Sequence, residues 1–187
     1  MTSIETIAGL AAVAGISGCL VWLYNRLVRL RNLARSSWSD IDVLLKKRHD
    51  LVGNLVETVK GYADYEKDTL IGVTEARARA MRAEGPGKRG KEESALGEKL
   101  ATLFAVAESY PDLKANESFL ELQKQLAEIE NGIEYARRYY NAVVRDYNTA
   151  TETFPSNLVA SSFGFGGAEF FQLDSPRERE RTDVRLS

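Results

Sequence analysis

Apolar residues recur at every third or fourth position along most of this chain. From Leu27 to Val59 they form one stripe with a single gap at Arg48 and His49, and such spacing predicts an amphipathic helix. No proline occurs before Pro86, so no residue of that kind interrupts a helix over this stretch. The N-terminal third of the chain is therefore expected to be helical.

Gly61 and Asp64 mark the expected end of the first helix. Glycine favours the position just after a helix, and aspartate favours the position just before one. The alternative is one helix that continues without a break to Ala83. If the chain does break, a second helix covers about residues 65–83, and an exposed loop rich in Gly, Pro and charge follows at 84–91.

A third helix is predicted at about residues 92–109, ending before Pro111. The fourth begins after Asn116, stops at Pro155 and has the most regular pattern in the chain. Its apolar positions alternate by three and four, as in a heptad seam: Phe119, Leu122, Leu126, Ile129, Ile133, Ala136, Tyr140, Val143, Tyr147 and Ala150.

The first and fourth helices have similar expected lengths, so we expect them to pair antiparallel with Tyr62 level with Asn116. This register places Asp40 beside Arg137, where a half-buried ion pair would stabilise the bundle. The rings expected to shield that pair are those of Trp38 and Tyr139.

An uncharged segment at residues 6–25 precedes the first stripe. As a helix it rises about 30 Å, enough to cross the hydrocarbon core of a bilayer. Trp22 and Tyr24 stand near its end and four arginines follow, so the positive-inside rule puts the N-terminus outside and the bundle in the cytoplasm. The side chains expected to anchor this helix in lipid are Ile7, Leu10, Val13, Ile16, Leu20 and Trp22.

A lipoprotein is the alternative for this segment, because Ile16–Cys19 resembles a bacterial lipobox in which Cys19 would be acylated after cleavage. We prefer an uncleaved anchor in the cell membrane, since Met1–Glu5 lacks the positive charge of a signal peptide. Small residues that would let two such helices approach closely line one face: Ala8, Ala11, Gly15 and Gly18.

The fold class that follows is all-α. An N-terminal transmembrane helix precedes an up-and-down antiparallel bundle of four helices, or three if the first is continuous. The expected divisions are an anchor at 1–25, a soluble bundle at 26–153, a Phe- and Gly-rich segment at 154–173 and a charged, disordered tail at 174–187.

Composition excludes several classes of function. The net charge of -2 lacks the basic excess of a nucleic-acid-binding protein. One cysteine, Cys19, and one histidine, His49, are too few for a His/Cys metal site. We expect His49 on the bundle surface or bonded to Asp50, and we expect no enzyme activity, metal or cofactor.

Polar residues flank the apolar faces of the first and fourth helices. They are either solvated or form a semi-buried network that fixes helix register. The candidate members of that network are Asp40, Asp50, Asn54, Glu57, Arg137 and Asn141.

Phenylalanines gather in the C-terminal segment between flexible glycines. They either pack on the bundle or contact the bilayer or another subunit. The candidate contact residues are Phe163, Phe165, Phe170 and Phe171.

Several motifs, in order along the chain, resemble the LemA family: Ser37–Val43, Lys47–Tyr62, Glu108–Asn116, Tyr135–Asn141, Tyr147-Asn148 and Phe154–Asn157. The resemblance extends from about Tyr24 to Leu173 and implies a membrane-anchored bacterial helical bundle without established chemistry. Some members resemble lipoproteins, and one branch is linked to magnetosome membranes. The chain departs from the family where Gly53 replaces a usual Pro and where the charged tail replaces the usual end.

These features together favour a non-enzymatic, membrane-anchored scaffold that self-associates and organises membrane or recruits proteins to it. The alternative is an accessory or adaptor subunit of another membrane protein, such as a protease or transporter. The expected partners are membrane lipid, further copies of the chain and a possible membrane-protein partner, but no nucleic acid.

Overall fold

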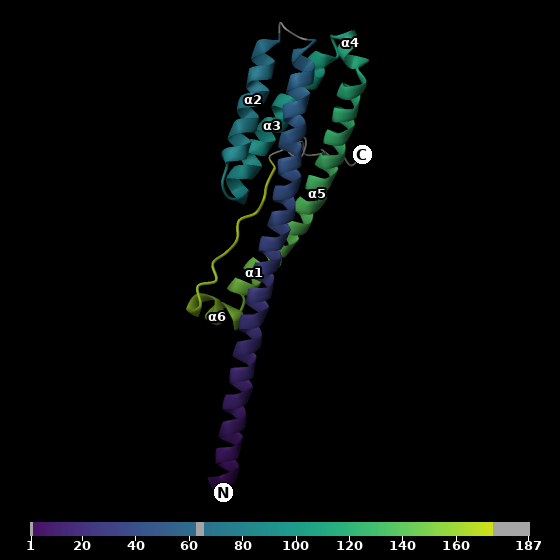
Figure 1. Ribbon diagram of the computed structural model, residues 1–187. Helices are drawn as coiled ribbons and strands as arrows, with labels where there is room; N and C mark the ends of the chain where they lie inside the picture. Colours follow the sequence, from purple (N-terminus) through teal and green to yellow (C-terminus); the bar gives the residue numbers. More distant parts are fainter. Residues whose placement is uncertain (1, 63–65, 174–187) are drawn as a thin grey trace, which may run out of the picture. The chain divides into compact units, whose positions relative to one another are not determined.

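A computed structural model describes residues 2–62 and 66–173, and in this part of the chain it contains six helices and no strand (Figure 1). The helices are α1 (Thr2–Lys60), α2 (Lys67–Arg82), α3 (Pro86–Ala107), α4 (Pro111–Lys114), α5 (Glu117–Glu152) and α6 (Ser156–Ser162). The predicted all-α class is confirmed.

The break after the first helix is also confirmed. Helix α1 runs for 59 residues through the predicted anchor and the first amphipathic stripe, and it ends at Lys60. The chain turns there, with the Tyr62 amide donating to the Val59 carbonyl. Asp64 lies outside the described residues, and Glu66 precedes α2. A single helix to Ala83 is therefore wrong.

The predicted loop at 84–91 is mostly helix. Helix α3 begins at Pro86, and Gly85 precedes it with φ 79°. Proline has no amide hydrogen to lose at the first position of a helix, and its fixed φ suits helical geometry. The Gly-Pro pair therefore starts α3 instead of marking a long loop.

The chain divides into two compact units. The anchor unit consists of Met1–Trp38 and Tyr139–Ala168. The bundle unit consists of Ser39–Arg138 and Glu169–Ser187, of which the structure describes residues up to 173. Helices α1 and α5 each contribute to both units, and the predicted soluble bundle at 26–153 includes parts of both.

In the bundle unit, parts of α1 and α5 pack with α2 and α3. Four residues of α2 are buried, namely Leu70, Val73, Ala76 and Ala80. The Asn116 amide donates to the Tyr62 hydroxyl at 2.9 Å, and Arg48 lies 2.6 Å from Glu130. Both contacts join residues that the expected antiparallel register of α1 and α5 places level with each other.

The predicted ion pair between Asp40 and Arg137 does not form within this register. Asp40 is exposed, while its neighbour Ile41 is fully buried. Consecutive residues on a helix point about 100° apart, so Ile41 takes the inward position and Asp40 is turned toward solvent. Asp42 forms an ion pair with Arg89 of α3.

The anchor unit contains the N-terminal part of α1 and the C-terminal part of α5. Helix α6 and the chain after it pack against these two segments (Figure 1). Its core comprises Leu23, Leu27, Tyr147, Ala150, Val159, Ala160 and Phe165. Trp38 packs on Tyr140 with ring centroids 5.5 Å apart. Tyr139, the ring expected beside Trp38, is exposed.

Candidate membrane-proximal site

The N-terminal part of α1 is a bare apolar helix. Its most apolar stretch has a mean hydropathy of 1.9, and only 6% of that stretch is buried. The predicted anchor residues are all exposed, namely Ile7, Leu10, Val13, Ile16, Leu20 and Trp22. The predicted small-residue face is exposed as well, at Ala8, Ala11, Gly15 and Gly18. By length and composition this helix can cross a membrane.

Protein packing around α1 begins abruptly at Leu23. Trp22 is 60% exposed, whereas Leu23 is 4% exposed and belongs to the anchor-unit core. Arg26 and Arg29, both exposed, follow within two turns. The point where other elements first cover α1 is therefore also the point where its uncharged segment ends.

Helix α6 lies beside this part of α1 and carries exposed apolar side chains at its flanks. Val159 of α6 packs in the same core as Leu23. Phe154 and Leu158 are 74% and 57% exposed. Phe163 makes an edge contact with Tyr24 at 5.0 Å and still leaves most of its ring uncovered. Such a cluster of large exposed apolar groups is typical of a surface that meets lipid or another protein.

The chain after α6 folds back and is held by hydrogen bonds to α5. The Asn148 side chain both donates to the Ala168 carbonyl at 3.0 Å and accepts from the Ala168 amide at 2.8 Å. The Tyr147 hydroxyl donates to the Gly166 carbonyl at 2.9 Å. Gly164 has φ 68°, a conformation that glycine adopts without strain.

Burial raises the pKa of the Tyr147 hydroxyl, against the lowering effect of the Arg31 and Arg35 charges. Arg31 also lies over the Phe165 ring, 4.6 Å from its centroid. The phenol therefore stays neutral and available to donate to the folded-back chain.

The four C-terminal phenylalanines divide into two groups. Phe163 and Phe170 are exposed, as a contact role requires. Phe165 and Phe171 are buried, so the prediction that they meet the bilayer or another subunit is wrong for these two. Phe165 packs edge-on against Tyr24 at 5.6 Å.

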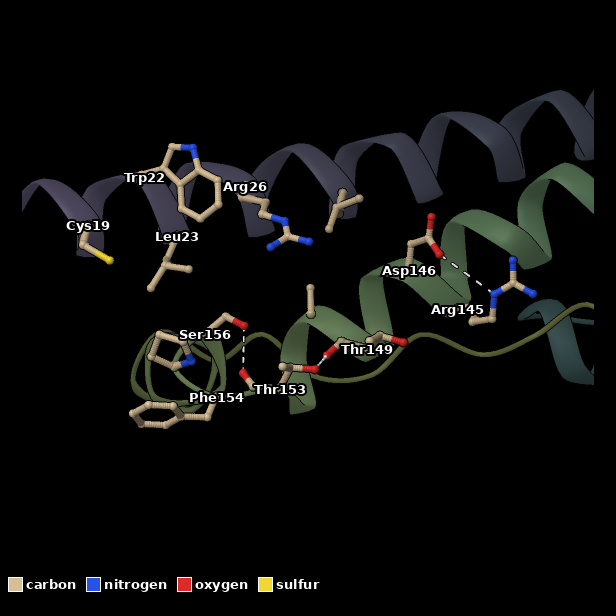
Figure 2. A pocket seen from close by; sticks show the side chains of 13 residues that line it. Cys19, Trp22, Leu23, Arg26, Arg145, Asp146, Thr149, Thr153, Phe154 and Ser156 are labelled. Carbon is tan, nitrogen blue, oxygen red and sulfur yellow. Dashed lines mark hydrogen bonds and ion pairs between the residues drawn. The ribbon is translucent and has the colours of Figure 1, made fainter.

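A cavity of about 590 Å³ opens between α1 and the end of α5, where the chain turns into α6 (Figure 2). Cys19, Trp22 and Phe154 supply apolar surface, and Arg26 and Arg145 supply positive charge. In Figure 2 the Arg26 side chain extends from α1 toward α5. The cavity therefore combines an apolar part with cationic groups.

Two of the hydroxyl groups that line this cavity already donate to backbone carbonyls. The Thr153 hydroxyl donates to the Thr149 carbonyl at 2.7 Å, and the Ser156 hydroxyl donates to the Thr153 carbonyl at 2.8 Å (Figure 2). The Arg26 and Arg145 guanidinium groups and the Thr149 hydroxyl therefore remain as donors for a ligand.

The bundle unit contains a buried network of charges. Glu93, with a side chain 0% exposed, lies 2.6 Å from both Arg48 Nη1 and His49 Nε2. Arg48 also contacts the half-exposed Glu130 at 2.6 Å, and Arg77 donates to the His49 carbonyl at 2.6 Å. His49 is thus buried and bonded to Glu93, and its predicted place on the surface or beside Asp50 is wrong.

This network contains none of the six residues that the sequence analysis named for one. Of the six residues named from the sequence, four are exposed and two are half-buried: Asp40, Asp50, Asn54 and Glu57, then Arg137 and Asn141. A sequence signal for the Glu93 network was available, because Glu93 stands three residues before the buried Leu96. The gap at Arg48 and His49 falls likewise on the buried stripe of α1.

No group of three or more His, Cys, Asp or Glu side chains among the described residues could hold a metal ion. Gly53, which stands where proline is usual in the resembled family, lies inside the unbroken α1. A Cβ there would come within 3.4 Å of the Arg77 guanidinium. The position is therefore packed against α2, without a proline kink.

Comparison with known proteins identifies similar chains. A model described as the LemA family matches residues 37–186, a range that includes the charged tail. Magnetosome protein MamQ 2 of Paramagnetospirillum magneticum is 27% identical over 91% of this chain and 72% of its own length. Protein LemA of Metamycoplasma hominis is 27% identical over 87% of this chain and 74% of its own length. Together with the bare apolar helix, these relatives indicate a membrane-associated protein.

Proposed function

The chain belongs to the LemA family, and we propose that it is a membrane-anchored helical scaffold without catalytic activity of its own. In this role it self-associates and organises the membrane or recruits proteins to it. The uncleaved α1 crosses the cell membrane with its N-terminus outside and the bundle unit in the cytoplasm.

The observation that carries this proposal is the abrupt change along α1 at Leu23. Before it the helix is bare and apolar, and after it the helix is packed and followed by exposed arginines. A bare apolar helix is costly in water but stable in hydrocarbon. The arginines favour the cytoplasmic side. The buried Glu93 network, closed to solvent at its centre, is suited to holding helices together.

Self-association is expected along the small-residue face of α1. Without larger side chains, two such helices can approach closely and gain van der Waals contact in lipid. The full-length protein in nanodiscs should be a discrete homo-oligomer by mass photometry. Gly15→Leu should shift it toward monomer, whereas Gly9→Leu, at an exposed glycine off this face, should not.

An adaptor role is the second candidate, and a groove on the bundle unit favours it. The groove has a volume of about 500 Å³ and lies between α1 and α2, with Val56, Leu70 and Ile71 among charged neighbours. Ile71 is 54% exposed, so an apolar partner segment would gain contact there. A monomer in nanodiscs that retains one stoichiometric membrane protein would favour this role and contradict the scaffold.

A further inference from the structure

We propose that the cavity between α1 and the α5–α6 turn binds an anionic phospholipid. Arg26 contacts the lipid phosphate, Arg145 adds a second positive charge, and an acyl chain lies along Cys19 and Trp22. This proposal rests on the membrane insertion of α1 proposed above, but it does not require self-association.

The cationic part of the cavity suits a phosphate. Within the described chain Arg26 forms no ion pair, and its guanidinium carbon lies 5.7 Å from the centre of the Trp22 ring. Arg145 is held only weakly, 3.9 Å from the exposed Asp146. An arginine presents several N–H donors in a planar fork that matches phosphate oxygens. The cavity thus offers two guanidinium groups against one carboxylate.

The apolar part of the cavity distinguishes a lipid from a soluble anion. Cys19, Trp22 and Leu23 belong to the same helix as the bare segment, and Phe154 lines the opposite wall. An acyl chain can therefore pass from the cavity onto α1 without crossing a polar surface. Inorganic phosphate would use the arginines alone and leave this apolar surface wet.

The depth of the cavity in the bilayer agrees with this occupant. If residues 6–25 span the hydrocarbon, Trp22 lies at the interface that tryptophan prefers. Arg26 is one turn farther along α1, at the level of the headgroups. The exposed rings of Phe154 and Phe163 would then enter the same interface.

Quenching of Trp22 by brominated acyl chains tests the proposal in the full-length protein. Trp38→Phe removes the other tryptophan. Vesicles of phosphatidylcholine receive a minor fraction of either brominated phosphatidylglycerol or brominated phosphatidylcholine. One arginine near a membrane surface contributes about 1 kcal/mol, so phosphatidylglycerol should be preferred by roughly fivefold or more.

Arg26→Gln should remove most of that preference, and Arg145→Gln should remove part of it. Arg29→Gln is the matched control, because Arg29 is an exposed arginine of the same cluster that does not line the cavity. Equal loss in Arg26→Gln and Arg29→Gln would show a general surface attraction and overturn the site. An unchanged preference in Arg26→Gln would overturn it as well.

Inorganic phosphate added at constant ionic strength separates the two sources of the anion. It should leave the preference intact, and abolition of the preference would assign the cavity to a soluble anion. If neither brominated lipid quenches Trp22, α1 is not inserted, and both the lipid site and the membrane anchor are wrong. If both brominated lipids quench Trp22 equally, α1 is inserted in the bilayer and only the lipid site is refuted.

Discussion

The buried carboxylate of Glu93 provides a strict test of how the bundle unit is held together. Glu93→Gln preserves the size of the side chain and removes its charge. The new amide oxygen can still accept from Arg48, but Arg48 then keeps only one carboxylate, Glu130, whose side chain is 45% exposed. His49 loses a charged partner at 2.6 Å. The substitution therefore leaves a buried cation with incomplete compensation.

The expected cost follows from this geometry. Removing one partner of a buried ion pair costs about 3–5 kcal/mol in the free energy of unfolding. Because Glu130 and one retained hydrogen bond still compensate Arg48, we expect about 2–4 kcal/mol here. Adding Arg48→Met removes the stranded guanidinium. The double variant should therefore lose less than the sum of the single losses, with a coupling above about 1.5 kcal/mol.

Hydrogen exchange of the α2 and α3 amides measures the stability of the bundle unit in the full-length protein in detergent. Glu92→Gln is the matched control, because Glu92 pairs with Arg79 at 3.3 Å and both side chains are partly exposed. Glu92→Gln should lower the free energy of unfolding by only about 0–1 kcal/mol. If Glu93→Gln and Glu92→Gln cost the same, the buried network does not hold the helices together and the reasoning fails.

Three further predictions concern the C-terminal segment and topology. Gly90→Ala should release the C-terminal segment from α3, because the new Cβ would lie 2.1 Å from the Gln172 carbonyl oxygen, and faster proteolysis would detect the release. Gly87→Ala should not release it, because its Cβ would meet only the flexible Glu169 carboxylate at 3.4 Å. The raised pKa of Tyr147 means that its stabilising effect is complete below about pH 10 and is lost as pH rises through the folded value. Tyr147→Phe should therefore flatten the alkaline loss of stability in unfolding followed by circular dichroism, and an unchanged slope would contradict this. Lys88→Cys, exposed in α3, should resist a membrane-impermeant thiol reagent in whole cells, while Ser3→Cys should react; the reverse result would invert the topology.

The long helices and their register could be predicted from the sequence because both depend on one repeating property. Apolar side chains at three- and four-residue spacing fix which face of a helix is buried, and the two longest stripes pair along their length. The contact between Tyr62 and Asn116 follows from that pairing. Helix α6 could not be predicted in this way, since seven residues are too few to show a period.

The fold-back of residues 163–168 depends on tertiary structure. Where only α1 and α5 are present, their shared apolar face would remain open to water on one side. Phe165 and Val159 cover that face, and the glycines between the rings allow the chain to return along α5. The sequence shows that such rings and glycines are present, but it does not show that this face needs a cover.

The charged contacts separate two requirements that the sequence pattern does not distinguish. The predicted register places Arg48 level with Glu130 as well as Asp40 level with Arg137, yet only the first pair forms. Being level is not sufficient, because each side chain must also point across the interface, and Ile41 occupies that direction beside Asp40. The ion pair between Arg48 and Glu93 also requires that α3 be rotated so that Glu93 faces α1. The pairing of α1 with α5 does not determine that rotation. A charged residue that interrupts a buried stripe, as Glu93 and Arg48 both do, is therefore a better guide to a network than charges that flank one.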